Sequence, residues 1–515
     1  DVYKRQEWTP CGLALPWDHY GWALPMRSAM AYASRRSGDP MYRQILEHYA
    51  SWTHDIAVGW GFDDLVWTLI WWPDEEKPVA GQGICSWAEP EVGGAIVSPR
   101  ADLYLMQMWD RSEPGCPGRA HVNPNALALV AYGSPLTADG ICAKDCSVFD
   151  FSDTWREVGG ADFQRRRYNF GQGCGGAHGV LLVDNWEGMR AQSEYPQTRA
   201  VLRQEPTAIG ADVTPIYQER FPDIKLVARL SRLCQGRFWL IEDRLEAEKE
   251  HEVTCRWYFR PTVIASDRGA AIETAEGVRL TLLPLLGPDE KSIRQIAGYP
   301  DRLDGESVQV DFRQRGRICR WVWLLWPEAM RRLHQEVDEN WQVLADSVCH
   351  DDVASVKESL TASSLRLPFT MPAFMMKDMP LVRRWWYRKI ITPPSSGRWW
   401  LRLPINLREP RLWLSGVEID LSAHLLRGQL LPPQVEAPAG LGRGDVEVIV
   451  RTDCSLGQYG EKENGGTCFW GKPAIMTETC GDSLIDARLE QRQVWVKSAG
   501  GEWKIDISDG LICRD

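Results

Sequence analysis

The chain has 515 residues, about three times the length of a typical domain, so the sequence predicts two or three separate cores. Its hydrophobic content of 44% and charged content of 25% are ordinary for a globular protein. The sequence has no run of about 18 apolar residues, the length that could span a membrane. The formal net charge of −11 argues against a nucleic-acid partner, because phosphate binding needs a basic face.

The first part of the chain has a helical pattern. Between Trp17 and about Trp72, apolar residues recur at three- and four-residue steps, and Gly38-Asp39-Pro40 marks the end of one helix and the start of the next. Two or three such helices cannot close a core alone, so we expect them to pack on the following sheet or on further helices. The chain begins DVYKRQ, with neither Met nor a targeting segment, so we expect an N-terminal part to be missing.

After Pro73, short β-type runs separated by Gly, Pro and Asp replace the helical period. Such runs at close intervals are typical of a large antiparallel sandwich, which we place at residues 76–350. The clearest runs are residues 126–132, 180–183, 238–242, 253–259 and 319–325.

A smaller β unit is predicted over residues 375–500. Arg398 to Leu403 has the pattern of a strand, and Leu412 to Ile419 that of a hairpin turning at Ser415-Gly416. With the runs WWYRKIITPP and DVEVIV, this unit resembles the galactose-binding-like jelly roll of β-galactosidase-type enzymes. The resemblance implies a module that either binds sugar or braces a catalytic unit.

Tryptophan is unusually frequent, at 26 residues, and occurs in the pairs Trp71-Trp72, Trp385-Trp386 and Trp399-Trp400. Flat indoles stack on sugar faces, and they also fill protein cores. The composition therefore favours a carbohydrate partner without locating a site.

Two segments carry the most specific motif: residues 118–140, GRAHVNPNALALVAYGSPLTADG, and residues 176–185, GAHGVLLVDN. They resemble the heparinase II/III-like polysaccharide lyases, in which a His-x-His-x-Asp-like turn, a Gly-x-x-Leu loop and an Asp-x-Gly-type turn precede a later His-bearing strand. His121, residues 133–136, Asp139 and His178 match these elements in order. The resemblance covers about residues 12–345.

The resemblance implies a multidomain, mainly β protein in which an (α/α) toroid packs on an antiparallel β-sandwich. Residues 7–75 would then be the C-terminal part of the toroid. The implied activity is a polysaccharide lyase that cleaves an acidic, uronic-acid-containing polysaccharide by β-elimination. For the full-length protein, a secreted or periplasmic location is expected.

The motif Leu-Pro-Trp-Asp-His-Tyr at residues 15–20 resembles the family's catalytic turn and points to Tyr20 as the proton-transfer group, with His19 near the substrate. His121 would act on the substrate carboxylate or as a base, and Tyr168 is a second proton-transfer candidate. A packing role remains the alternative for Tyr20.

The substrate carboxylate needs positive or hydrogen-bonding partners. Asn123 stands where the family has its second motif His, and the run Arg165, Arg166 and Arg167 lies between the two motif segments. These arginines either grip substrate carboxylates or form a solvated face.

The family's structural zinc site would fall on Asn123, Asp139 and His178. An amide oxygen is a poor zinc ligand beside imidazole, and the 14 cysteines show no finger-like spacing. The sequence thus predicts that no cofactor is required and leaves Asp139 and His178 as tentative metal ligands or as a hydrogen-bonded pair that supports the turn.

Two other functions remain open from the sequence. A glycoside hydrolase would use paired carboxylates in place of Tyr and His. A non-catalytic glycan-binding protein would fit Asn123 and Asn125, which stand where the family has its second motif His and the following Asp. The resemblance implies an active cleft between the toroid and the sandwich. Because we expect half of the wall of that cleft to be missing, we expect this chain alone to be inactive or nearly so.

Overall fold

We describe the protein from a computed structural model. The described residues are 85–89, 93–98, 103–109, 124–132, 134–137, 179–186, 200–259, 262–265, 269–274, 276–296, 307–337, 339–346, 350–357, 360, 364–365, 369–370, 384–403, 411–421, 434–441, 444–453, 468–469, 473–479 and 481–510. The helical segment predicted between Trp17 and Trp72 lies outside them. Within these ranges, no helix is long and apolar enough to cross a bilayer.

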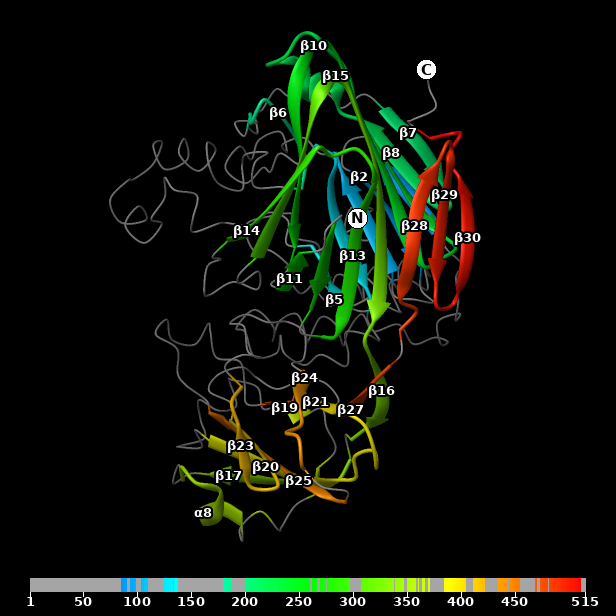
Figure 1. Ribbon diagram of the computed structural model, residues 1–515. Coiled ribbons are helices and arrows are strands. Elements are labelled where there is room, and N and C mark those ends of the chain that lie inside the picture. The colour runs from blue at the N-terminus through cyan, green and yellow to red at the C-terminus, as the bar shows by residue number, and fades with distance from the viewer. Residues whose placement is uncertain are drawn as a thin grey trace, which may run out of the picture.

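The prediction of a mainly β protein is confirmed. The first sheet has five antiparallel strands in chain order (Figure 1): β1 (Cys85–Glu89), β2 (Gly93–Ser98), β3 (Leu103–Met108), β4 (Ala126–Ala131) and β5 (Ser134–Pro135). Every side chain of β3 and β4 is buried, which explains why these strands are almost entirely apolar and lack polar alternation, with Gln107 of β3 as the polar exception.

The second sheet has ten antiparallel strands. Its main path runs β11-β12-β13-β15-β10-β9-β8-β7, with β14 paired to β15 and β6 paired to β10. The strands are β6 (Leu181–Val183), β7 (Ala200–Glu205), β8 (Ala208–Asp212), β9 (Ile224–Cys234), β10 (Phe238–Phe259), β11 (Thr262–Ala265), β12 (Ala270–Glu273), β13 (Val278–Leu286), β14 (Glu290–Ile296) and β15 (Ser307–Ala329); α7 (Thr214–Gln218) lies between β8 and β9.

One long strand replaces two predicted ones. The runs 238–242 and 253–259 are the two ends of β10, which pairs with β15 along both. The register of this pair shifts between Glu246 and His251, where the chain is polar and partly exposed. A polar stretch thus marks a bulge in the strand and not its end.

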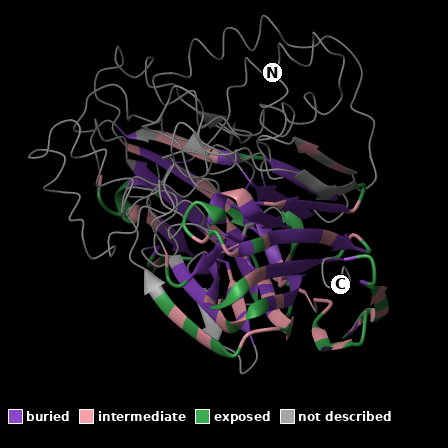
Figure 2. Ribbon diagram, turned by 90° about the horizontal axis from the view of Figure 1, so that it is seen from above, coloured by how far each residue is buried: buried purple, intermediate pink, exposed green. Residues whose placement is uncertain are grey.

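The ten-stranded sheet is buried on both faces. Trp239 and Ile241 of β10 pack in the core shared with the five-stranded sheet. Their neighbours Phe238 and Leu240 pack on the opposite face, against a three-stranded sheet of β28 (Leu484–Glu490), β29 (Gln493–Ser498) and β30 (Gly501–Asp506). Figures 1 and 2 show this arrangement, in which the chain's last strands return to the larger unit and the central strands are mostly buried.

The remaining strands form a smaller sandwich with its own core. One sheet has the order β16-β27-β21-β24, the other β18-β17-β20-β25-β22-β23, and β19 pairs β26. The elements are β16 (Arg331–Glu336), β17 (Trp341–Asp346), α8 (Val353–Lys357), β18 (Ser364–Leu365), β19 (Phe369–Thr370), β20 (Arg384–Ile391), β21 (Trp399–Arg402), β22 (Arg411–Leu414), β23 (Val417–Ile419), β24 (Gln434–Glu436), β25 (Val446–Asp453), β26 (Cys468–Phe469) and β27 (Ala474–Glu478). The boundaries assigned to the units from the sequence stay predictions.

The hairpin predicted at Ser415-Gly416 is confirmed. Leu412 pairs with Ile419 across the turn, and both turn residues have positive φ, 46° and 81°. Two consecutive positive φ angles match the twist of a tight hairpin, and the glycine adopts one of them without side-chain strain.

The tryptophan pairs of the smaller sandwich serve packing. Trp385, Trp386, Trp399 and Trp400 are all buried, and the ring of Trp386 stacks on that of Trp413 with centroids 5.5 Å apart. Trp71-Trp72 lies outside the described residues. The described pairs therefore present no flat face to a sugar.

The burial of the ten-stranded sheet on the side of the main core can be tested with two leucines of β13. Leu282 is fully buried in the main core, whereas Leu286 is 38% exposed at the end of the strand. We expect Leu282→Ala to lower the free energy of unfolding by about 2–5 kcal/mol, because it removes buried methyl groups and leaves a cavity. Leu286→Ala is the matched control and should cost less than about 1 kcal/mol. Equal losses in denaturant titrations would contradict the burial described for β13.

Candidate functional site

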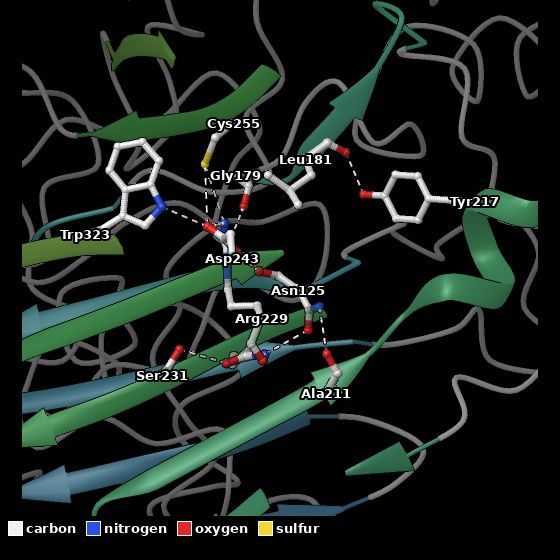
Figure 3. Close-up of polar contacts among 11 residues, drawn as sticks. Asn125, Gly179, Leu181, Ala211, Tyr217, Arg229, Ser231, Asp243, Cys255 and Trp323 are labelled. Carbon is white, nitrogen blue, oxygen red and sulfur yellow. Dashed lines mark hydrogen bonds and ion pairs between the residues drawn. The ribbon is translucent and has the colours of Figure 1, made fainter. Parts of the chain in front are cut away.

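A buried ion pair lies at the centre of the larger unit. Arg229 of β9 and Asp243 of β10 face each other as cross-strand partners. The Nε and Nη2 atoms of Arg229 donate to the two carboxylate oxygens of Asp243 at 2.6 and 3.0 Å (Figure 3). Both side chains are almost completely buried, with exposures of 1% and 0%. The two groups therefore form a bidentate pair shielded from solvent.

Neighbouring groups keep Arg229 charged. Burial lowers the pKa of Arg229, but the negative charge and hydrogen bonds of Asp243, together with smaller contributions from other neighbours, outweigh it and hold that pKa above its ordinary value. The indole Nε1 of Trp323 donates to Asp243 Oδ2 at 2.8 Å, and the guanidinium of Arg229 lies 5.3 Å from the ring centroid of Trp257. These contacts compensate part of the desolvation cost of the two charges.

Arg229 also holds two backbone segments that are far apart in the sequence. Its Nη1 donates to the carbonyl oxygen of Asn125 and, at 3.2 Å, to that of Gly179. Figure 3 shows Arg229 between these two residues. One guanidinium thus fixes the start of β4 and the residues that lead into β6.

A second set of polar contacts joins the two sheets around Asn125. Gln107 of β3 donates through Nε2 to Asn125 Oδ1 at 2.8 Å and to the carbonyl of Arg229 at 3.1 Å, and it accepts from Ser231 Oγ at 2.7 Å. Asn125 Nδ2 donates to the carbonyl of Ala211 at 3.2 Å. Asn125 has a φ of 64°, a left-handed conformation that asparagine tolerates well. We call Arg229, Asp243, Asn125, Gln107 and Ser231 the Arg229 hub.

Two ionisable side chains near the hub, Cys255 and Tyr217, are buried. The thiol of Cys255 lies 3.7 Å from Arg229 Nη2, and burial raises its pKa well above the usual range. Burial likewise raises the pKa of Tyr217, whose hydroxyl donates to the carbonyl of Leu181 at 2.5 Å. Both groups therefore stay protonated, and neither serves as a nucleophile or a base at neutral pH.

The residues predicted from the sequence to form the site lie outside the described residues: Tyr20, His121, Tyr168, His19, Asn123, Arg165, Arg166, Arg167, Asp139 and His178. Their roles stay predictions. What the structure brings together are the adjoining positions, because Asn125 follows Asn123 by two residues and Gly179 directly follows His178. Among the described residues, no three His, Cys, Asp or Glu side chains converge as a metal site requires.

The hub itself was missed by the sequence analysis, although a signal was present. Arg229 lies in the middle of β9, and Glu242 and Asp243 directly follow the apolar run at the start of β10. Opposite charges in two successive buried strands indicate an ion pair, because an unpaired charge there would be very costly. Both strands carry further charges, such as Arg232 and Glu246, so the pattern alone did not say which two side chains meet.

No family model matches the sequence, and no curated protein matches it. Among solved structures, the chain is similar to a heparinase III, with 9% identity and a TM-score of 0.40 over 66% of this chain and 49% of that one. It is also similar to the heparan sulfate lyase HepC from Pedobacter heparinus, with 11% identity and a TM-score of 0.41 over 66% of this chain and 47% of that one. The chain spans about half the length of these structures.

A weaker similarity, to a β-glucuronidase from Faecalibacterium prausnitzii, has 17% identity and a TM-score of 0.24 and covers 35% of this chain and 41% of that chain.

The contribution of the hub can be measured by removing its cation. Arg229→Met leaves the carboxylate of Asp243 buried and uncompensated, so we expect a loss of about 3–5 kcal/mol in the free energy of unfolding. Arg237→Met is the matched control, because Arg237 pairs with Asp482 at 2.8 Å on the surface and its removal should cost no more than about 1 kcal/mol.

Chemical denaturation of purified variants provides the measurement. If Arg229→Met cannot be purified in a folded form, Arg229→Lys is measured in its place. Lysine keeps the positive charge but cannot reach all the acceptors of the guanidinium, so we expect a loss of stability between those of Arg229→Met and the surface control. Similar stabilities for the Arg229 and Arg237 variants would show that the hub contributes no more than a surface pair.

Proposed function

We propose that this chain is part of a polysaccharide lyase that cleaves a uronic-acid-containing polysaccharide by β-elimination. The observation that carries the proposal is the double anchoring by Arg229, which holds Asn125 and Gly179 through one guanidinium nitrogen. Each of these residues lies within one of the two motif segments of the lyase-like pattern, with His121 four residues before Asn125 and His178 directly before Gly179. This anchoring supports a single site that draws on both segments.

Chain geometry sets how far the two histidines can lie from the hub. Four residues of extended chain span at most about 14 Å, and neighbouring Cα atoms are about 3.8 Å apart. In the proposal, His121 and His178 therefore contribute to one site near the two backbone segments that Arg229 holds.

The residue types suit the proposed chemistry. The C5 proton of a uronic acid is only weakly acidic, so elimination needs a partner that neutralises the carboxylate, a base near C5 and an acid at the departing O4. In the proposal, Asn123 and the arginines 165–167 bind the carboxylate and Tyr20 transfers the protons. His121 donates to the carboxylate or acts as the base, and Tyr168 is the second candidate for proton transfer. The proposed reaction needs no redox cofactor.

The proposal is tested in the full-length protein with His121→Ala and Tyr20→Phe. Each variant should lower turnover of a uronate polysaccharide by roughly 10²- to 10⁴-fold, the usual contribution of a positioned proton-transfer group, while the fold stays intact. His334→Ala is the matched control, because His334 is an exposed residue of β16 and its loss should leave turnover unchanged.

The assay follows the unsaturated, ultraviolet-absorbing sugar end that elimination creates. Products that lack an unsaturated non-reducing end would replace the proposal with a glycoside hydrolase, and binding without products would replace it with a glycan-binding protein. If only Tyr20→Phe kept normal turnover, Tyr20 would be a packing residue and Tyr168→Phe would be the next variant.

A further inference from the structure

A buried histidine bridges two carboxylates beside the hub. His251 lies on β10 directly after the register shift and is only 6% exposed. Its Nδ1 lies 2.8 Å from Asp184 Oδ2, and its Nε2 lies 3.0 Å from Asp223 Oδ2. A carboxylate only accepts hydrogen bonds, and only the protonated imidazolium donates from both ring nitrogens. The geometry of the three side chains is therefore that of an imidazolium held between two anions.

The two carboxylates come from separate segments that each bond β10 as well. Asp184 directly follows β6, where its Oδ1 accepts the amide of Glu252 at 3.0 Å. Asp223 directly precedes β9, and its Oδ2 accepts the amide of Lys249 at 3.2 Å. His251 thus ties the end of β6 and the start of β9 to the middle of β10.

Strand β6 depends on such anchors because it is short. It consists of three residues and pairs with β10 at Val253 to Cys255. At its start, the carbonyl of Gly179 is bonded by Arg229, and at its end Asp184 is bonded by His251. His178, a site residue of the proposed lyase, directly precedes Gly179.

The other groups around His251 leave its two bonds undisturbed. The ring of Phe221 packs edge-on against the imidazole with centroids 5.4 Å apart. Nearby charges are satisfied elsewhere: Lys225 pairs with Glu248 at 3.3 Å, and Arg315 of β15 pairs with Glu250 at 2.6 Å. The side chains of these two ion pairs are more than half exposed, and water screens them.

Two residues after β6, Asn185 donates through Nδ2 to Glu252 Oε1 at 3.0 Å. The residue opposite His251 on β15 is Gly316, which brings no charge. Asp184 and Asp223 are therefore the charged partners bonded to the imidazole.

We infer that His251 is a positioning residue whose imidazolium holds β6, and with it the His178 segment, in place. Loss of the proton removes one of the two donors, so the end of β6 loosens from β10. The structural part of this inference concerns β6 alone. Its consequence for turnover, a decline at high pH, rests on the proposed lyase function.

The direction of the pH dependence follows from the partners. Burial lowers the pKa of His251, but the hydrogen bonds and charges of Asp184 and Asp223 outweigh it and raise that pKa above 6.5. The hydrogen bond from His251 lowers the pKa of Asp223 below 3.8. The stabilisation is therefore complete between about pH 4 and about pH 6.5, and it fades as pH rises through the raised pKa of His251.

Hydrogen exchange of the β6 amides, corrected for the intrinsic effect of pH, tests the inference in the unmodified chain without any substrate. We expect protection of β6 to fall about tenfold to a hundredfold as pH rises through the pKa of His251, because a charge-assisted hydrogen bond is lost. His251→Gln should show the low protection at every pH. Asp184→Asn, which preserves shape and removes one anion, should flatten the pH dependence.

His350→Gln is the matched control, because His350 pairs with Asp346 at 3.0 Å in the smaller sandwich and its loss should leave β6 unchanged. The inference would be overturned if the exchange protection of the β6 amides did not change with pH. It would also be overturned if that protection were equal in the wild type, His251→Gln and Asp184→Asn. A clear response of β6 in a protein that never forms unsaturated products would instead overturn the lyase proposal and leave the role of His251 standing.

Discussion

The larger unit depends on one buried ion pair. A charge in an apolar core is tolerated only if it is paired and its remaining hydrogen-bonding groups are satisfied, and Arg229 meets this condition through Asp243 and two backbone carbonyls. Because those carbonyls belong to distant segments, satisfying one guanidinium also fixes where the two segments meet. The ion pair thus specifies geometry at least as much as it adds stability.

The pair can have this role because the sheet that carries it is covered on both sides. Its central strands pack on the five-stranded sheet through one face and on β28 to β30 through the other. Water cannot reach the hub to compete for its hydrogen bonds, so the contacts within it are stronger than similar contacts on the surface. The same burial keeps the thiol of Cys255 and the hydroxyl of Tyr217 protonated, so neither group acts as a nucleophile or a base at neutral pH.

Strand β6 connects the Arg229 hub to the segment of the proposed site that contains His178. The hub holds one end of the strand and the bridge from Asp184 through His251 to Asp223 holds the other. The two anchors differ in their response to solution conditions. Arg229 remains charged at any physiological pH, whereas an imidazolium can lose its proton, so the two ends of one short strand are held by a permanent and a titratable cation.

The sequence by itself determined the class of the fold and several of its strands. Period-two patterning, turn chemistry and continuous apolar runs depend on local stereochemistry and burial, so β4, β6, β15 and the Ser415-Gly416 hairpin were predictable. The motif around His121 and His178 indicated a function through resemblance, and the residues of that motif remain predictions.

Only the tertiary structure decided which distant groups meet. The polar stretch between Glu246 and His251 has the local pattern of a turn, but pairing with β15 carries the strand through it. Partners such as Arg229 with Gly179, or His251 with Asp184 and Asp223, are separated by tens of residues along the chain. No local propensity encodes these pairings, because they arise when strand order and register bring buried charges within reach of one another.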